Sequence, residues 1–218
     1  MSDLICENYS MLLVMSRFGI ALGFGDRTIG EVCRAAGVDT RTFLAVVNLV
    51  LSGEGAPAAD LAFSVASLID YLHNSHDYFL DFRLPGIRSE LAGALGGGDI
   101  SVAILRYFDE YVAEVQRHMR YEEEVVFPYV RALVAGGRAE GYSIGIFRRQ
   151  HDQVEARLTE LRDIIIRYYP GGSTNELNAA LFDIFSCAHD LAAHNRVEDE
   201  LFVPAIEALE RKERGRKP

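Results

Sequence analysis

The sequence contains one pattern twice: a His, a Glu four residues later and a Pro six residues after that. The first copy is His118, Glu122 and Pro128, and the second is His194, Glu198 and Pro204. Residues four positions apart on an α-helix lie about 40° apart around the axis and about 6 Å apart along it. Each His–Glu pair therefore points in one direction, and two such pairs need a fold in which helices face a shared interior.

Four long segments have the apolar spacing of amphipathic helices. We expect these helices at about 60–95, 99–135, 141–169 and 174–211, with a kink in the first at Pro85. The breaks between them are Gly96-Gly97-Gly98, Gly136-Gly137 and Pro170-Gly171-Gly172. No segment alternates apolar and polar residues as a strand does. The pattern predicts an all-α fold, an up-down four-helix bundle.

A small helical domain is expected before the bundle. Residues 52–57 combine Gly and Pro and predict a break, so we place domains at 1–53 and 58–212, followed by a basic tail at 213–218. In the small domain Thr28 and Glu31 have the spacing of a capping box. Gly37 is expected to end that helix and Asp39 to cap the next.

Composition excludes several classes of function. No apolar run reaches the roughly 18 residues of a membrane span. The start of the chain lacks the basic and apolar regions of a signal peptide. Three widely spaced cysteines, Cys6, Cys33 and Cys187, argue against a disulfide framework. We therefore expect a cytoplasmic protein with no membrane partner. The net charge of −10 disfavours nucleic acid, because phosphates attract basic surfaces.

Every expected long helix offers metal donors. The candidate ligands, in chain order, are His73, His118, Glu122, His151, His194 and Glu198. A carboxylate has two oxygens, so each Glu can bridge two metals while each metal takes two His. Such donors suit iron or manganese, and also zinc. A single His on a helix is more often a surface or core group than a ligand, so the repeat across helices is what favours metal. His151 and Glu155 form a third pair, which we leave out because it breaks the symmetry of the two hairpins.

Four stretches resemble the hemerythrin-like domain of the RIC (repair of iron centres) family, the ScdA/YtfE-type proteins. They are His73-Asn-Ser-His76, His118-Met-Arg-Tyr-Glu122-Glu123, Gln150-His151-Asp152, and His194-Asn-Arg-Val-Glu198 followed by Leu201-Phe202-Val203-Pro204. The resemblance extends over nearly the whole chain, including the small domain. It implies a hemerythrin-like bundle in which four His and two bridging Glu hold two iron ions, with an oxo or hydroxo bridge. The family's ligands fall on the six candidates above.

The resemblance also implies a function. Members of the family protect bacteria against nitric oxide and oxidants, and are thought to help restore damaged iron–sulfur clusters. The implied ligands are NO and O2, the implied partners are iron–sulfur proteins, and a homodimer is compatible with the sequence. The chain departs from the family where a Cys-Cys pair normally precedes a Gly-Gly step, because that pair falls on Leu22 and Gly23. Cys33 is no substitute, and we expect it in the core.

Several further residues lie near the candidate ligands. Glu114 precedes His118 by one turn and is a candidate neighbour of the metals. For His76 we favour hydrogen bonding over ligation, because a fifth His would make the two metal sites unlike. His189 lies about 140° around the helix from His194 and is left out. The remaining candidates are aromatic, Tyr71, Tyr107, Tyr111 and Tyr121, and they are more often core residues than redox partners.

Two alternative functions remain open. The segment from Thr28 to Asp39 has the rhythm of a helix-turn-helix, so the chain could be a regulator with a di-iron sensor of O2 or NO. Against DNA binding, residues 1–52 carry a net charge of −1. The chain could also be a plain O2-binding or iron-storage hemerythrin, in which His76 would be a fifth His ligand. The sequence does not decide between catalysis, storage and iron donation.

Overall fold

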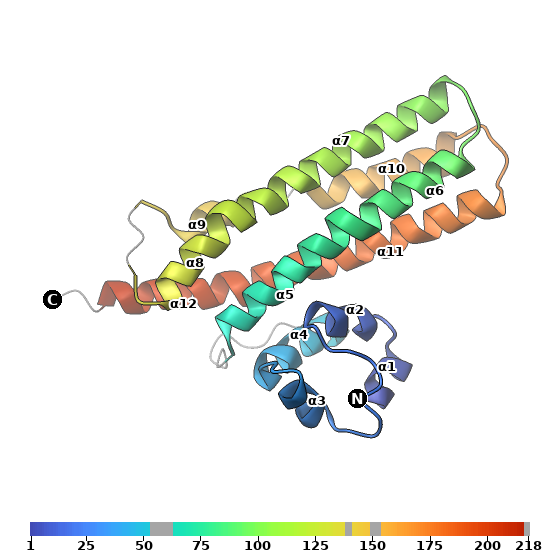
Figure 1. The fold of residues 1–218 in the computed structure, drawn as a ribbon. Coiled ribbons are helices and arrows are strands. Elements are labelled where there is room, and N and C mark those ends of the chain that lie inside the picture. The colour runs from blue at the N-terminus through green and yellow to red at the C-terminus, as the bar shows by residue number, and fades with distance from the viewer. Residues whose placement is uncertain (53–62, 138–140, 149–153, 216–218) are drawn as a thin grey trace. The chain divides into compact units, whose positions relative to one another are not determined.

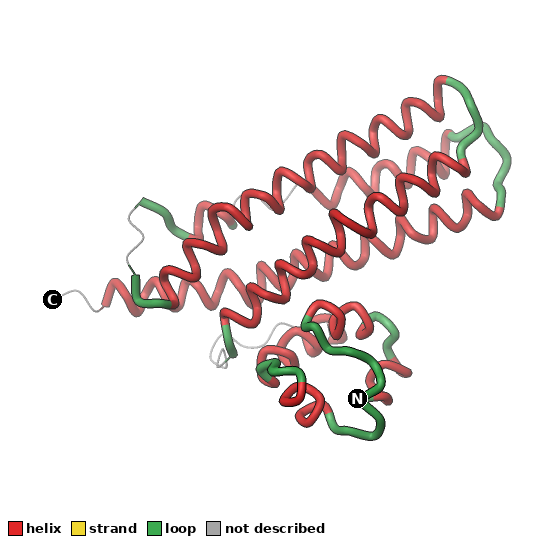
Figure 2. Tube along the Cα trace, viewed as in Figure 1, coloured by secondary structure: helices red, strands yellow, loops and turns green. Residues whose placement is uncertain are grey.

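The structure is a computed structural model that describes residues 1–52, 63–137, 141–148 and 154–215 (Figure 1). Within those residues the regular elements are all helices, and none is a strand (Figure 2). This confirms the all-α fold class. None of the helices in the described part of the chain is long and apolar enough to cross a membrane.

The helices follow the order expected from the sequence. The small N-terminal region contains α1 (Ser2–Glu7), α2 (Met11–Arg17), α3 (Ile29–Ala35) and α4 (Thr40–Ser52). The first long helix consists of α5 (Val65–Asp77), η2 (Tyr78–Arg83) and α6 (Leu84–Ala94), and the second of α7 (Asp99–Tyr121), η3 (Glu122–Val126) and α8 (Phe127–Val134). The region of the third contains α9 (Ile144–Phe147) and α10 (Val154–Tyr168). The fourth consists of α11 (Asn175–Val197), η5 (Glu198–Phe202) and α12 (Val203–Gly215). The expected domain boundary at 53–58 lies outside the described residues, as does the middle of the third helix at 149–153.

Three of the long helices contain a π-helical segment that ends two residues before a proline. These segments are η2, η3 and η5, and the prolines are Pro85, Pro128 and Pro204. A proline inside an α-helix lacks an N–H donor, and its ring clashes with the carbonyl four residues earlier. A π-helical turn bonds five residues apart instead of four and occurs often at functional sites. The helices therefore continue past the prolines, and two of the π segments begin at Glu122 and Glu198.

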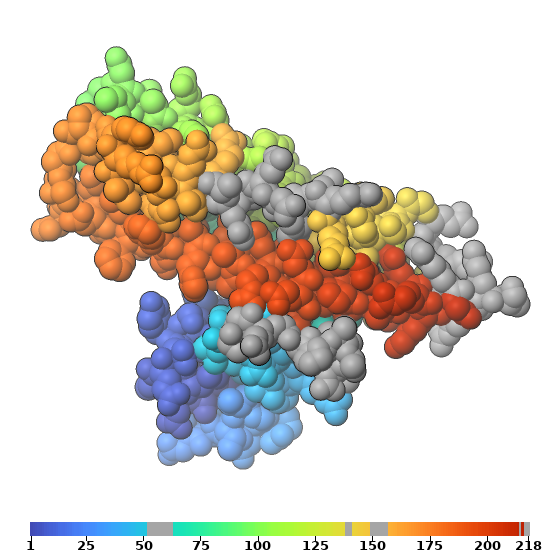
Figure 3. Space-filling model, turned by 180° about the vertical axis from the view of Figure 1, so that it is seen from behind, coloured from blue at the N-terminus to red at the C-terminus, as the bar shows by residue number. Residues whose placement is uncertain are grey.

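The described chain divides into two compact units. One consists of residues 76–125 and the described part of 149–193. Its apolar core lies among η2, α6, α7, α10 and α11, with Ile87, Phe108 and Leu161 fully buried. Helix α7 packs on α6 and α10. Helices α10 and α11 lie side by side in Figure 3. Between them, the guanidinium of Arg162 lies over the ring of Phe185, 4.8 Å from its centroid.

The loops at one end of this unit also meet. The backbone N–H of Gly96, between α6 and α7, donates to the hydroxyl oxygen of Tyr169, between α10 and α11, at 2.9 Å. Both loops lie at the same end of the helices in Figure 1. The unit thus consists of two helical hairpins packed together, as an up-down bundle requires.

The other unit consists of 1–75, 126–148 and 194–218, as far as these are described. The N-terminal region contacts α5, where Phe18, directly after α2, packs on Tyr71 with ring centroids 4.8 Å apart. Asn74 Nδ2 also donates to the Arg17 carbonyl at 2.7 Å. Helix α12 packs on α8 and α9. The carboxylate of Glu210 accepts from the Tyr129 hydroxyl at 2.6 Å and the Ile144 N–H at 2.8 Å.

The helix ends of the small region follow the sequence signals. Thr28 and Glu31 form the expected capping box, with Thr28 N–H donating to Glu31 Oε2 at 2.8 Å. Gly37 has φ +70°, a conformation that glycine adopts without strain, and it follows α3 directly after Ala36. Asp39 Oδ2 accepts from the backbone N–H of Thr42 at 2.8 Å and from its hydroxyl at 2.6 Å. These three expectations are confirmed.

The Asp39 cap gives a pH-dependent prediction. Burial raises the pKa of Asp39, but the hydrogen bonds from Thr42 outweigh it, so the pKa lies below the ordinary 3.8. A lowered carboxyl pKa stabilises the fold above the unfolded value, and the contribution disappears as pH falls through the folded value. Asp39→Ala should lower the free energy of unfolding by about 1 kcal/mol at pH 7.

Urea titrations at stepped pH measure this effect. The gap between wild type and Asp39→Ala should stay constant down to about pH 4 and narrow at lower pH. Asp26→Ala removes an exposed carboxylate from the same region and serves as the control. A gap that is the same at every pH would show that the carboxylate charge does not act in the cap.

The core of the helical hairpins gives a second prediction. Ile104 and Val102 lie two residues apart on α7, but Ile104 is 3% exposed and Val102 is 64% exposed. Ile104→Ala should lower the free energy of unfolding by about 2–5 kcal/mol, because it leaves a cavity. Val102→Ala should change it by less than about 0.5 kcal/mol. Equal effects in a denaturant titration would contradict the packing described for α7.

Candidate metal centre

Four buried side chains bring potential metal ligands together. Among the described residues, His76, Glu122, His194 and Glu198 each offer one donor atom, and these atoms all lie within 4.8 Å of one another. His76 comes from α5, Glu122 and Glu198 from the first positions of η3 and η5, and His194 from α11. We call these four residues the His/Glu group.

Helix periodicity explains why His76 is buried. Leu68, Leu72 and His76 follow one another at intervals of four, which places them on one face of α5. Both leucines are fully buried and His76 is only 2% exposed. The imidazole thus occupies a position that the apolar pattern would give to a core residue.

The carboxylate of Glu122 lies between two imidazoles. Its Oε2 is 2.9 Å from His76 Nε2, and its Oε1 is 2.7 Å from His118 Nε2. Glu122 is fully buried and His118 is 12% exposed. Both oxygens of one buried carboxylate therefore face ring nitrogens, as they would around a shared cation.

The two imidazoles also keep Glu122 charged. Burial alone raises the pKa of this carboxyl, since a buried charge loses its hydration. His118 and then His76 outweigh burial and hold the pKa well below the ordinary range. A metal ligand must be deprotonated, so the surroundings keep Glu122 in the form that binds a cation.

The second copy of the repeat has the geometry predicted from its spacing. His194 Nε2 lies 3.2 Å from Glu198 Oε1, four residues further along the helix. The side chains are 1% and 0% exposed. The pair is therefore buried as deeply as the pair formed by His76 and Glu122.

The donors of the His/Glu group fit a transition metal. Two fully buried carboxylates close together are costly unless positive charge compensates them. Imidazole nitrogens and carboxylate oxygens are the usual ligands of iron, manganese and zinc in proteins. The group thus has both the charge and the donor types that a divalent cation requires.

Only some of the six ligands predicted from the sequence lie in the His/Glu group. Glu122, His194 and Glu198 belong to the His/Glu group, and His118 contacts Glu122. His73 is exposed on α5 and is not part of the group, whereas His76 is. His151 lies outside the described residues. The complete ligand set therefore stays a prediction.

Two signals in the sequence favour His76 over His73. One is the buried stripe of α5 formed with Leu68 and Leu72. The other is the spacing between the hairpins, since His151 precedes His194 by 43 residues. His76 precedes His118 by 42 residues and His73 by 45, so His76 fits the repeat more closely.

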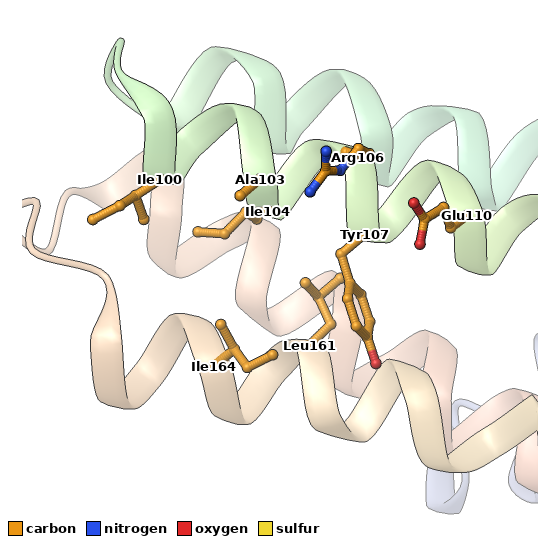
Figure 4. A pocket seen from close by; sticks show the side chains of 8 residues that line it. All are labelled: Ile100, Ala103, Ile104, Arg106, Tyr107, Glu110, Leu161 and Ile164. Carbon is orange, nitrogen blue, oxygen red and sulfur yellow. The ribbon is translucent and has the colours of Figure 1, made fainter.

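The residues near the ligands have partners of their own. Glu114 accepts from Arg157 at 2.7 Å, and Tyr107 donates to Glu160 at 2.6 Å. Tyr107 also lines a cavity of about 290 Å³ between α7 and α10 (Figure 4). Tyr107 lies 11 residues before His118, which is about 16 Å along a helix, so this cavity is no part of the His/Glu group.

Comparison with known proteins gives one match. Residues 67–206 match the family model described as the hemerythrin HHE cation binding domain. The matched range includes all six sequence-predicted ligands and the whole His/Glu group. No curated protein and no solved structure matches the chain.

The neighbouring histidines of α5 give a third prediction. His76→Ala should weaken binding of Co²⁺ to the metal-free protein by more than about tenfold, because it removes a buried donor of the group. His73→Ala removes an exposed imidazole three residues away and should leave the affinity within about twofold of wild type. Co²⁺ absorption titrations measure both. The reverse order would instead support the set that contains His73.

Proposed function

The chain belongs to the hemerythrin HHE cation-binding domain family, and from that premise we propose that it is a non-heme di-iron protein of nitrosative and oxidative stress. The family and the His/Glu group make it a metal-binding protein of the hemerythrin-like kind. The supporting observation is the fully buried Glu122, whose two oxygens lie within 2.9 Å of two different imidazoles. A carboxylate in that position suits a bridge between two cations.

The proposed ligands include those predicted from the sequence and those of the His/Glu group. His76, His118, Glu122, His194 and Glu198 would hold the metals, with His73 and His151 as the further candidates. Iron in such a site supplies redox chemistry and an open position for a diatomic ligand. The two carboxylates would offset part of the charge of the cations, and the imidazoles would bind as neutral ligands.

The four residues of the His/Glu group are all buried. A small diatomic molecule passes through such packing more easily than a larger polar substrate does. The burial of the group thus favours NO and O2 as ligands.

The small N-terminal region lacks the pair of thiols that the resembling family has, which limits how the chain could take part in iron–sulfur cluster repair. Leu22, where the resembling family has the first thiol, is 69% exposed, and Gly23 follows it with φ +85°. Cys33 is fully buried, and burial raises the pKa of its thiol. We propose that any supply of iron to damaged clusters proceeds without vicinal thiols at this turn.

A plain O2-binding hemerythrin is the second candidate. It is favoured by the presence of His76 in the His/Glu group, because His76 would add a fifth His to the four predicted from the sequence. The two candidates differ in their response to O2: reversible binding for an O2 carrier, and oxidation or NO capture for a stress protein.

The test is metal content and absorption of protein purified without oxygen. About two irons per chain are expected, with new absorption bands after addition of NO. His194→Ala should lose most of the iron. His189→Ala changes an exposed His on the same helix and should retain it.

The outcomes separate the candidates. Reversible spectral changes with O2 and none with NO would favour the O2 carrier. Zinc alone, or no metal in protein supplied with iron, would contradict the di-iron proposal.

A further inference from the structure

Glu123 contacts the buried imidazole of His76 on the side away from Glu122. Glu123 Oε1 lies 2.7 Å from His76 Nδ1, while Glu122 Oε2 lies 2.9 Å from His76 Nε2. The Glu123 side chain is 33% exposed and His76 is 2% exposed. Two consecutive carboxylates of η3 therefore contact the two ring nitrogens of one histidine.

We propose that Glu123 is a positioning residue that fixes the tautomer and the orientation of His76 so that Nε2 is the metal-binding nitrogen. The inference rests on the proposed metal site and deepens it. Glu123 itself is not a ligand in this proposal. It acts through the imidazole that it holds.

The hydrogen bond determines where the proton lies. An ionised carboxylate accepts hydrogen bonds and has no proton to donate. The 2.7 Å contact therefore places the proton on His76 Nδ1, which donates to Glu123. The other ring nitrogen, Nε2, lies on the side of Glu122 and is the nitrogen that would bind the metal.

A carboxylate lies at each ring nitrogen of His76, so in metal-free protein a second proton on Nε2 can be shared with Glu122 Oε2, 2.9 Å away. A cation bound by Nε2 would replace that proton, while the proton on Nδ1 would stay with Glu123. Metal-ligating histidines commonly donate their other ring N–H to a carboxylate, which raises the basicity of the ligating nitrogen.

The π-helical segment explains how neighbouring residues reach one ring. On an α-helix, consecutive residues point about 100° apart and do not face the same side chain. Glu122 and Glu123 are the first two residues of η3, where a turn contains more residues and consecutive side chains point in more similar directions. Segment η3 thus supplies both Glu122, a proposed ligand, and Glu123, which contacts the imidazole of His76.

Variants of Glu123 test the proposal by two readouts. In metal-free protein, the ¹⁵N NMR signal of His76 Nδ1 should show a protonated nitrogen in wild type and a smaller protonated fraction at Nδ1 in Glu123→Ala. Co²⁺ affinity should fall about 10–100-fold in Glu123→Ala. The fall should be smaller in Glu123→Gln, since the amide oxygen still accepts from Nδ1 but carries no charge.

Glu124→Gln is the matched control. Glu124 is the next residue of η3 and is exposed, so both readouts should remain as in wild type. Thermal unfolding of each metal-free variant checks that it folds, and Glu123→Gln preserves the side-chain shape if Glu123→Ala does not fold.

The outcomes distinguish this inference from the proposed function. If His76→Ala loses Co²⁺ while both Glu123 variants bind it like wild type, the positioning role is wrong and the metal site stands. The same holds if the proton stays on Nδ1 in Glu123→Ala. If His76→Ala itself binds Co²⁺ normally, His76 is not a ligand and the site proposed around it fails.

Discussion

The arrangement of the long helices depends on two carboxylates that are buried among them. Glu122 and Glu198 are both fully buried, and ionised groups are rarely found there without compensating charge. Imidazoles lie beside each carboxylate, with His118 and His76 at Glu122 and His194 at Glu198. Helices that bring these residues together must therefore hold their positions closely, since a small shift would leave a buried charge without compensation.

The prolines and π-helical segments contribute to that positioning. Both buried carboxylates are the first residues of such segments, and a proline follows each segment within two residues. An uninterrupted α-helix would continue the regular 100° rotation and would direct the residues after Glu122 elsewhere. The His, Glu and Pro repeat thus produces the same local structure in two helices. In each, the proline favours the wider π-helical turn, and that turn orients the carboxylate at its start.

Much of the fold could be predicted from sequence, because its signals are local. Glycines and prolines between amphipathic segments predicted the helices, and the capping residues Thr28 and Asp39 were recognised from the chemistry of helix ends. The His–Glu pairs were found because four residues nearly complete one helical turn. The contact of Glu123 with His76 was not predicted, because a π-helical turn changes the direction of a side chain without changing the sequence spacing.

By itself, the sequence determined that the protein is helical, that His118, Glu122, His194 and Glu198 occur as repeated pairs, and that the thiol pair of the resembling family is missing. Only the tertiary structure decided which histidine of α5 joins the His/Glu group. His73 and His76 are both near the end of one helix, and the spacing along the chain differs too little between them to settle the choice. Burial separates them, because the packing of neighbouring helices covers one face of α5 and leaves the other exposed.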